Sequence, residues 1–237
     1  DVLDELPEKT ETTRSITLST QERALYEACR RDALLKAQES DDRFTILAQL
    51  MRLRRLCCHP QLIDSKWNAE AGKLTALTEL ASELKDSGHK ALIFSQFTDM
   101  LSLVRKEFDK QGFSYLYLDG NTPKAGRNKL VDTFQDGEAD FFLISLKAGG
   151  TGLNLTAADY VILLDPWWNP AVESQAADRT HRIGQKRPVT VCRFVCKDTI
   201  EERVMALHAE KRELFDQVIN DTGKPTPLSI TELRELM

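Results

Sequence analysis

The densest cluster of ionisable and amide side chains in the sequence is the segment 175–188, QAADRTHRIGQKRP. Four of its side chains are spaced i, i+3, i+4 and i+7, and on a helix they share one face. They are Gln175, Asp178, Arg179 and Arg182. An arginine keeps its charge and offers a planar fork of N–H donors, which suits bidentate contact with a phosphoryl group. The pattern therefore favours phosphate binding, although a solvated basic face explains the same spacing without a ligand.

Alternating helices and strands must position this segment. Short apolar runs predict buried strands at 91–95, 113–118, 141–145, 160–164 and 189–195, and helical patterns separate them. This alternation is typical of a parallel sheet covered by helices on both faces. Ligands bind outside the carboxyl ends of such strands, so we expect the site in the loops that follow the strands. Those loops begin after Ser95, Leu118, Ser145 and Leu164.

Helical patterns flank the α/β region on both sides. A capping box of Ser19 and Glu22 opens a helical pair that stops before Pro60, because the residue before a proline avoids the helical conformation. A second capping box, Thr199 with Glu202, predicts a long helix near the end of the sequence.

A phosphate loop is absent from the sequence. Nucleotide-binding α/β proteins normally carry G-x-x-x-x-G-K-[ST], whose backbone amides hold phosphate. The two Gly-Lys pairs, at 72–73 and 223–224, have neither the glycine spacing nor the hydroxyl residue. Asp165 ends an apolar strand as a Mg²⁺-binding aspartate does, but without a phosphate loop we interpret it as a polar strand end. We therefore expect that this chain alone does not hydrolyse nucleotide.

Several motifs together resemble one known family. The segments QAADRTHRIGQ (175–185) and SLKAGGTGLNLTAADYVILLDPWWNP (145–170) are similar to motifs VI and V of the Swi/Snf-type DNA translocases, in helicase superfamily two. IFSQF, LDGNT, LRRLCCHP and EAGKL match further family motifs, and the resemblance covers about 18–219. It implies an α/β fold, with a RecA-like parallel sheet flanked by helices, an N-terminal helical protrusion and a C-terminal bracing helix.

By this resemblance the chain is the second, C-terminal motor lobe, and the first lobe, with its phosphate loop and DExH box, is missing. We accordingly expect four parts. They are an acidic lead-in from the missing first lobe (1–18), the helical protrusion (19–71), the RecA-like lobe (72–198), and the bracing and C-terminal helices (199–237). The isolated lobe is predicted to be an inactive ATPase.

The resemblance also assigns the ligand of the basic segment. Arg179 and Arg182 correspond to arginine fingers that complete a site for ATP with Mg²⁺, which the first lobe mainly holds, and Gln175 lies beside them. These three are the predicted catalytic residues. The residues expected at the ATP interface are Gly150, Gly152 and Asp178.

Loops at the neighbouring edge are expected to contact the backbone of double-stranded DNA. Hydroxyls, glycine-exposed amides and cations suit phosphate contacts, which position a protein without reading sequence. The expected contacts are Ser95, Gln96, Arg127, Lys147, Gly149, Thr151 and Trp168. Two of these have alternatives, since Arg127 fits an exposed helix charge and Trp168 fits buried packing. The family usually has Thr-Arg where this chain has Leu146-Lys147, so the planar fork is lost there.

Composition limits the remaining possibilities. Thirty-two Lys and Arg against 37 Asp and Glu give a net charge of −5, which disfavours a strongly basic nucleic-acid-binding domain. Because net charge averages over faces, we expect the functional cations to cluster near one edge of the sheet. They are Arg127, Lys147, Arg179, Arg182, Lys186 and Arg187. The five cysteines lack a CxxC knuckle, so no metal site is expected, and no apolar run is long enough for a membrane span.

The leading hypothesis is thus the second motor lobe of an ATP-dependent double-stranded-DNA translocase. Its expected partners are DNA, the first RecA-like lobe of the same protein and a DNA-bound protein target, in a prokaryotic cytoplasm near the nucleoid rather than in a nucleus. The alternative is a non-catalytic RecA-like module that binds protein or DNA. An RNA-unwinding lobe fits less well, because such helicases carry a differently spaced motif VI.

Overall fold

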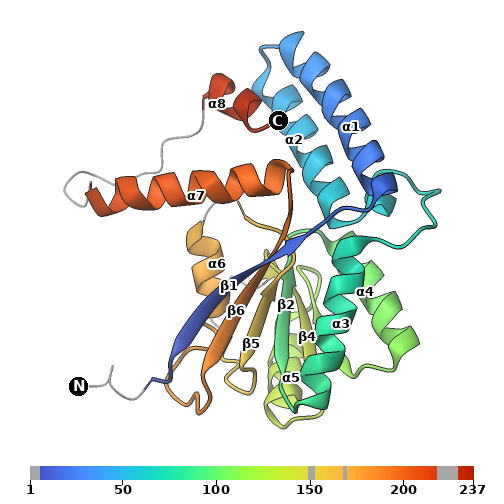
Figure 1. Ribbon diagram of the computed structural model, residues 1–237. Helices are drawn as coiled ribbons and strands as arrows, with labels where there is room; N and C mark the ends of the chain where they lie inside the picture. Colours follow the sequence, from blue (N-terminus) through green and yellow to red (C-terminus); the bar gives the residue numbers. More distant parts are fainter. Residues whose placement is uncertain (1–5, 149–152, 168–169, 218–228) are drawn as a thin grey trace. The chain divides into compact units, whose positions relative to one another are not determined.

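The computed structural model describes residues 6–148, 153–167, 170–217 and 229–237 (Figure 1). The chain divides into two compact units. The α/β unit comprises the residues up to Ile16 together with Lys73–Val195, and the helical unit comprises Thr17–Gly72 together with Cys196–Met237.

A six-stranded sheet forms the centre of the α/β unit, in the order β1-β6-β5-β2-β4-β3. The strands are β1 (Lys9–Ile16), β2 (Ala91–Ser95), β3 (Tyr115–Leu118), β4 (Phe141–Ser145), β5 (Tyr160–Leu163) and β6 (Val189–Cys196). The pairings among β2 to β6 are parallel, with Ser95 opposite Ser145 and Phe94 opposite Leu163. The ends of β2, β4 and β5 therefore meet at one carboxyl edge, as the apolar runs of the sequence predicted.

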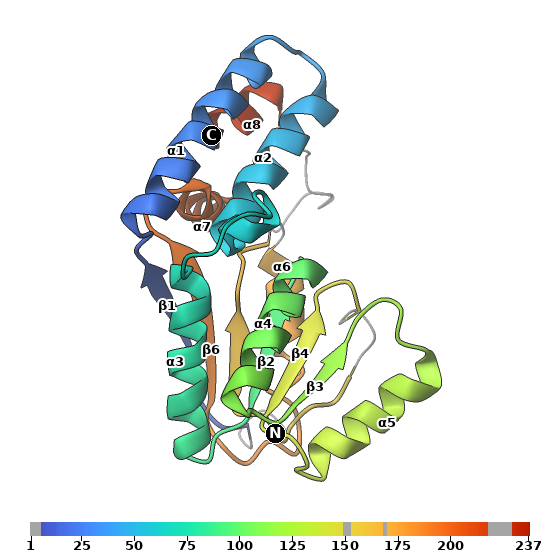
Figure 2. The same ribbon diagram turned by 90° about the vertical axis from the view of Figure 1, so that its right-hand side faces the viewer.

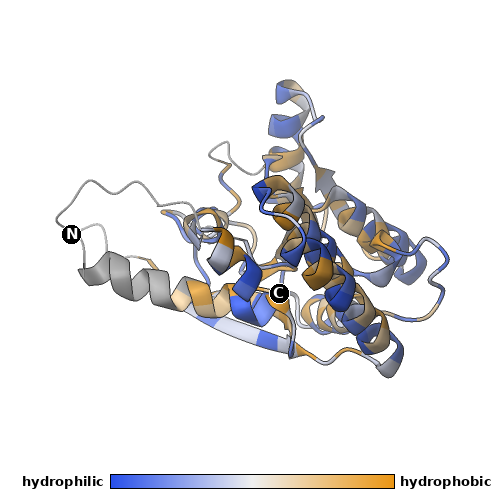
Figure 3. Cartoon of the chain, turned by 90° about the horizontal axis from the view of Figure 1, so that it is seen from above, coloured by the Kyte–Doolittle hydropathy of each residue, from blue (hydrophilic) through white to orange (hydrophobic). Residues whose placement is uncertain are grey.

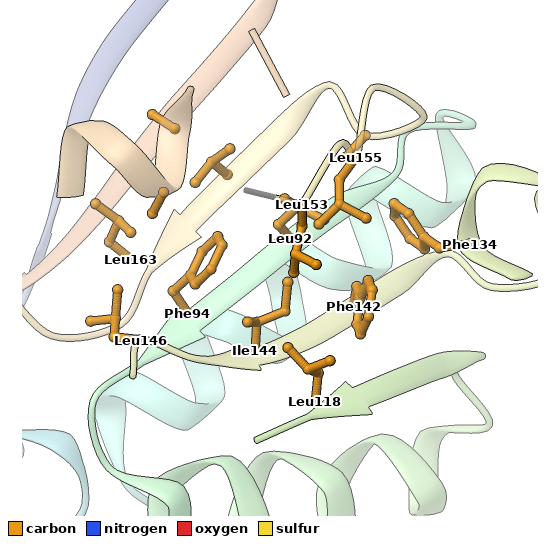
Figure 4. Close-up of a cluster of buried hydrophobic side chains, with 14 of the residues drawn as sticks. Leu92, Phe94, Leu118, Phe134, Phe142, Ile144, Leu146, Leu153, Leu155 and Leu163 are labelled. Carbon is orange, nitrogen blue, oxygen red and sulfur yellow. The ribbon is translucent and has the colours of Figure 1, made fainter. Parts of the chain in front are cut away.

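Helices cover the sheet because alternate strand residues face opposite sides. Helices α3 (Gly72–Asp86) and α4 (Thr98–Gln111) lie side by side against the sheet (Figures 1 and 2). Helices α5 (Lys124–Gln135) and α6 (Pro170–Ala177) occupy other positions around the sheet. Leu92, Phe94 and Phe142 pack with Phe134 of α5 and with α6 in one buried cluster (Figure 4). The RecA-like parallel fold is confirmed.

The segment before the helical pair contradicts our expectation. Lys9–Ile16, assigned to an acidic lead-in, forms the edge strand β1, which lies next to β6. The Val189 amide donates to the Glu8 carbonyl oxygen at 2.9 Å. Most side chains of β1 are exposed, so the strand lacks the apolar run that revealed the others. An edge strand rich in threonine and charge is stabilised by its partner strand rather than by a local apolar pattern.

The helical unit contains α1 (Thr20–Gln38), α2 (Arg43–Cys58), α7 (Ile200–Gln217) and α8 (Ile230–Glu235). The Ser19–Glu22 capping box is confirmed by both reciprocal hydrogen bonds, and α2 ends before His59-Pro60 as predicted. At the start of α7 the capping differs from the prediction, because Glu202 accepts from the Asp198 amide rather than from Thr199.

Hydrophilic and hydrophobic residues are mixed along the helices, as expected of helices that bury one face (Figure 3). Among the described residues, no helix is long and apolar enough to cross a bilayer.

Candidate functional site

The carboxyl edge of the sheet holds a buried polar network. The Ser95 hydroxyl, at the end of β2, donates to Asp165 Oδ1, and the Gln96 amide donates to Asp165 Oδ2 at 3.3 Å. Ser95 Oγ also accepts from the Phe97 amide at 3.1 Å. Because Ser95 is 0% exposed, its hydroxyl fixes the β2 loop to the β5 loop and does not reach the surface. In this structure the hydroxyl is engaged in internal contacts, and the expected contact of Ser95 with DNA stays a prediction.

Lys73 is a second member of this edge, and the sequence reasoning gave it no role. Its side chain is buried, and Nζ donates to the carbonyl oxygen of Leu164 at 2.8 Å. A buried ammonium is costly unless it is hydrogen-bonded, so the lysine ties the start of α3 to the end of β5. Its position in the EAGKL motif, at the start of a helix, was the available signal.

Gln96 and Lys147 are two further polar residues of this edge within the described part of the chain. Lys147 is exposed in the turn after β4. Gln96 is half-buried, and its buried Nε2 has no hydrogen-bond partner in the part of the chain that the structure describes. A buried unpaired amide donor is costly, and an incoming phosphate oxygen is a suitable acceptor for it.

Arg127 serves the turn in which it lies. It is half-buried at the start of α5, and Nε donates to the Thr122 carbonyl oxygen at 2.9 Å, with Nη2 3.4 Å from that of Gly120. The guanidinium thus stabilises the turn after β3, and the predicted contact of Arg127 with DNA stays a prediction.

Five predicted site residues lie outside the described residues. They are Gly149, Gly150, Thr151, Gly152 and Trp168. The neighbouring Trp167 is described, and it packs half-buried against the core cluster. Its amide donates to Glu173 Oε1 at 2.8 Å, so a buried carboxylate anchors this tryptophan loop.

Glu173 also belongs to a buried ion pair that sequence reasoning missed. Glu173 Oε2 lies 2.8 Å from Arg193 Nε, and Arg193 Nη1 lies 2.9 Å from Glu11 of β1. Burial alone lowers the pKa of Arg193, but the hydrogen bond and charge of Glu173, with Glu11, outweigh it and raise the pKa above its ordinary value. No local pattern signals a pair that joins three separate elements.

The basic segment is not one helical face. Helix α6 ends at Ala177, and turns continue to Val189, where β6 begins. The Thr180 hydroxyl donates to the Ala177 carbonyl oxygen at 2.9 Å, and Arg182 Nε donates to that of Asp178 at 2.8 Å. The prediction of a shared helical face is therefore wrong beyond Ala177, because the chain must turn there to enter the next parallel strand.

Gln185 holds these turns against the sheet. Its buried Nε2 lies within 3.2 Å of three carbonyl oxygens, those of Thr156, Ala158 and Thr180. Its Oε1 accepts from the amides of Lys186 and Arg187 at 2.8 and 2.9 Å. The final glutamine of the DRTHRIGQ motif thus holds the turns in place. The motif includes this residue, but residue spacing alone did not reveal its structural role.

Arg179 is the exceptional side chain of the clamped segment. It is 5% exposed, and Nε and Nη1 are buried with no hydrogen-bond partner among the residues described. Burial, together with the charge of Arg182, lowers the pKa of Arg179. A buried, unpaired guanidinium raises the energy of the unliganded chain, and an anion would relieve that cost.

The other predicted residues of this segment are exposed. They are Gln175 on α6, Asp178 and Arg182. Asp178 forms a 3.6 Å ion pair with Lys9, and His181 Nε2 lies 2.7 Å from the Pro7 carbonyl oxygen. Strand β1 and the residues just before it therefore contact these turns through Lys9 and Pro7.

The functional cations do not cluster at one edge, contrary to our expectation. Lys147 follows β4 at the carboxyl edge. Arg187 Nη1 instead contacts the Gly88 carbonyl oxygen and Asp159 Oδ2, at 3.0 and 3.2 Å, and these residues precede β2 and β5. Helix α6 returns the chain toward the amino edge, so the arginine segment and the loops after the strands form two separate regions.

These features define an α/β lobe with a buried arginine whose Nε and Nη1 no described residue accepts from, and with a sequence that lacks a phosphate loop. Comparison with known proteins agrees. The helicase conserved C-terminal domain matches residues 72–184, and the SNF2-related domain matches 1–62. The structure of the Sulfolobus solfataricus SWI2/SNF2 ATPase C-terminal domain superposes with a TM-score of 0.77 at 31% identity, over 97% of this chain and 98% of that one.

Two further relatives are longer than this chain. The S. solfataricus SWI2/SNF2 ATPase core in complex with dsDNA is 32% identical, with a TM-score of 0.77, over 92% of this chain and 47% of that one. A putative ATP-dependent helicase/translocase of Bacillus subtilis, YwqA, is 40% identical over 98% of this chain. The chain spans about a quarter of the length of the curated relatives it matches. It belongs to the SWI2/SNF2 family and is the C-terminal lobe of an SNF2-type motor domain.

Proposed function

We propose that this lobe is half of an ATP-driven motor that moves along double-stranded DNA. ATP, with its Mg²⁺, is held mainly by the first RecA-like lobe, and Arg179 and Arg182 complete the site across the lobe interface. Gln175 and Asp178 lie beside them, and Gly150 and Gly152 are assigned to the same interface. By this proposal the isolated lobe is inactive, because it lacks the phosphate loop and the DExH box.

The burial of Arg179 without a partner among the described residues is the observation that carries this proposal. The γ-phosphoryl group of ATP, in a closed two-lobe state, supplies the anion that the guanidinium lacks. Fixed arginines there stabilise the charge that spreads over the transferring phosphoryl oxygens, without reorganisation during the reaction. A non-catalytic binding module would retain a costly buried cation with no evident use.

For DNA, we assign the carboxyl edge to the sugar–phosphate backbone. Ser95, Gln96, Arg127 and Lys147 are the proposed contacts within the described part of the chain, and Gly149, Thr151 and Trp168 complete the proposed set. The arginine segment and the described carboxyl-edge residues Gln96 and Lys147 lie in separate regions of one lobe, so closing on ATP would shift these DNA contacts relative to those of the first lobe. A DNA-bound protein as the target and a location at a bacterial nucleoid belong to the same proposal.

The test is Arg182→Ala in a two-lobe ATPase that contains this chain. We expect DNA-stimulated ATP hydrolysis to fall by about 10³-fold or more, while DNA binding persists. Arg187→Ala is the matched control, because Arg187 belongs to the same segment but is paired with Asp159 and Gly88. Near-normal turnover in Arg182→Ala would contradict the proposal. Stimulation by single-stranded RNA rather than by duplex DNA would contradict the assigned substrate.

A further inference from the structure

Ile183 stands out in the α/β unit as a large hydrophobic side chain that is 72% exposed. The other exposed large hydrophobics described, Leu35 and Phe44, belong to the helical unit. A single exposed aliphatic residue needs no explanation by itself. The position of Ile183 in the chain supplies an explanation, since the residue directly follows Arg182 and lies four residues beyond Arg179.

The backbone presents Ile183 at the corner of a fixed turn. The Gln185 amide donates to the Arg182 carbonyl oxygen at 2.9 Å, so residues 182–185 form a β-turn with Ile183 at its second position. Gly184, at the third position, has φ of 102°, a conformation that favours glycine. An added Cβ at Gly184 would meet no atom within 4 Å, so the glycine serves the backbone conformation rather than close packing.

The base of this turn is anchored, whereas its corner is exposed. Gln185 makes hydrogen bonds to three carbonyl oxygens and two amides, and it is itself buried. Ordering a surface side chain costs conformational entropy when a partner binds. A corner that is already fixed reduces that cost, because less conformational freedom is lost on binding.

We propose that Ile183 is a docking residue, which inserts into an apolar depression of the first RecA-like lobe beside its nucleotide. The inference rests on the proposed function. It names the contact that would fix the position of Arg179 and Arg182 relative to the ATP of the first lobe. The continuity of Ile183 with those arginines identifies the first lobe as the occupant. The S. solfataricus ATPase core, of which this chain covers 47%, has the additional length that a first lobe requires.

The experiment measures lobe closure and hydrolysis separately in the full-length ATPase. Fluorescence energy transfer between the lobes reports closure as a non-hydrolysable ATP analogue is added, and steady-state assays with saturating duplex DNA give kcat and KM for ATP. The variants are Ile183→Ser, Ile183→Val and Arg182→Ala, with Leu35→Ser as the control for loss of an exposed aliphatic residue. Thermal unfolding of each variant checks that the exposed positions leave the fold intact.

For Ile183→Ser we expect the analogue concentration at half-closure and the KM for ATP to rise about tenfold or more, since one buried aliphatic side chain has this effect on association. Ile183→Val should stay within about threefold, and Leu35→Ser should match the wild type. Ile183→Ser that closes and binds ATP as the wild type does would overturn the inference. Normal turnover in Arg182→Ala would overturn the proposed function instead, so the two failures are distinguishable.

Discussion

Two buried arginines of the α/β unit lie in opposite electrostatic situations. Arg193 of β6 is paired with Glu173 and Glu11, and these carboxylates raise its pKa despite burial. Arg179 is as deeply buried, but burial and the like charge of Arg182 lower its pKa. The same fold thus pairs one buried cation with two carboxylates and leaves the other with two donor atoms, Nε and Nη1, from which no described residue accepts.

The difference indicates what each residue does. A paired arginine that joins β1, α6 and β6 contributes to the folded structure, provided that both partners remain present. An unpaired arginine in a segment that Gln185 clamps against the sheet lowers stability, and the proposed contact with ATP accounts for this cost. Variants of the two arginines test this contrast directly, and a variant of His59 extends it to a buried basic group that loses its charge, with expected effects that decrease in this order.

The largest effect is expected for Arg179→Leu, which should separate activity from stability. In a two-lobe ATPase, DNA-stimulated hydrolysis should fall by about 10³-fold or more, because a positioned arginine at the γ-phosphoryl group contributes that much. In the isolated lobe, the free energy of unfolding should stay unchanged or rise by about 1–3 kcal/mol, since a buried unpaired donor is removed. Steady-state kinetics and urea denaturation measure the two quantities. A large loss of stability would show that Arg179 is structural after all.

Arg193→Leu should give the opposite result in the isolated lobe. Removing one partner of a buried pair leaves the Glu173 carboxylate uncompensated, so we expect the free energy of unfolding to fall by about 3–5 kcal/mol. The double variant Arg193→Leu/Glu173→Gln should recover much of this loss, because the glutamine carbonyl can still accept from the Trp167 amide. If the single variant is as stable as the wild type, the contrast between the two arginines does not hold.

His59 shows a third outcome for a buried basic group, which is loss of its charge. In the helical unit, burial lowers the pKa of His59 from 6.5 to about 4, while its Nδ1 accepts from the Gln61 amide. Between these values the unfolded chain binds the proton more readily, so stability should decrease as the pH falls from about 6.5 to about 4. The variant His59→Asn keeps an acceptor and should lose this part of the pH dependence. The free energy of unfolding, measured by denaturation across this pH range, is compared between the wild type and His59→Asn. The same pH dependence in both would exclude a contribution of His59.

Local patterns were sufficient for most of the architecture. The five apolar runs became β2 to β6, and the Ser19–Glu22 capping box lies where the first helix begins. These features depend on residues that are near one another in sequence, so periodicity and capping chemistry reveal them. The family was recognisable for a related reason, because its motifs are short contiguous stretches such as DRTHRIGQ and IFSQF.

Predictions failed where distant residues decide the conformation. β1 is held by its pairing with β6, and its own sequence carries no apolar run. The internal contact of Ser95 was not predicted either, because its hydroxyl donates to Asp165, which lies 70 residues later in the chain. The helical face from Gln175 to Arg182 ended at Ala177, because the chain must turn before β6.

By itself, the sequence determined the parallel α/β class, the family and the segment in which the arginines lie. Only the tertiary structure decided which arginine is paired. Glu173 and Glu11 reach Arg193 from α6 and β1, whereas Arg179 is buried by turns that bring no carboxylate among the described residues within its reach. Charge is a local property of a residue, but its compensation depends on distances between segments that are remote in sequence, and those distances exist only in the folded chain.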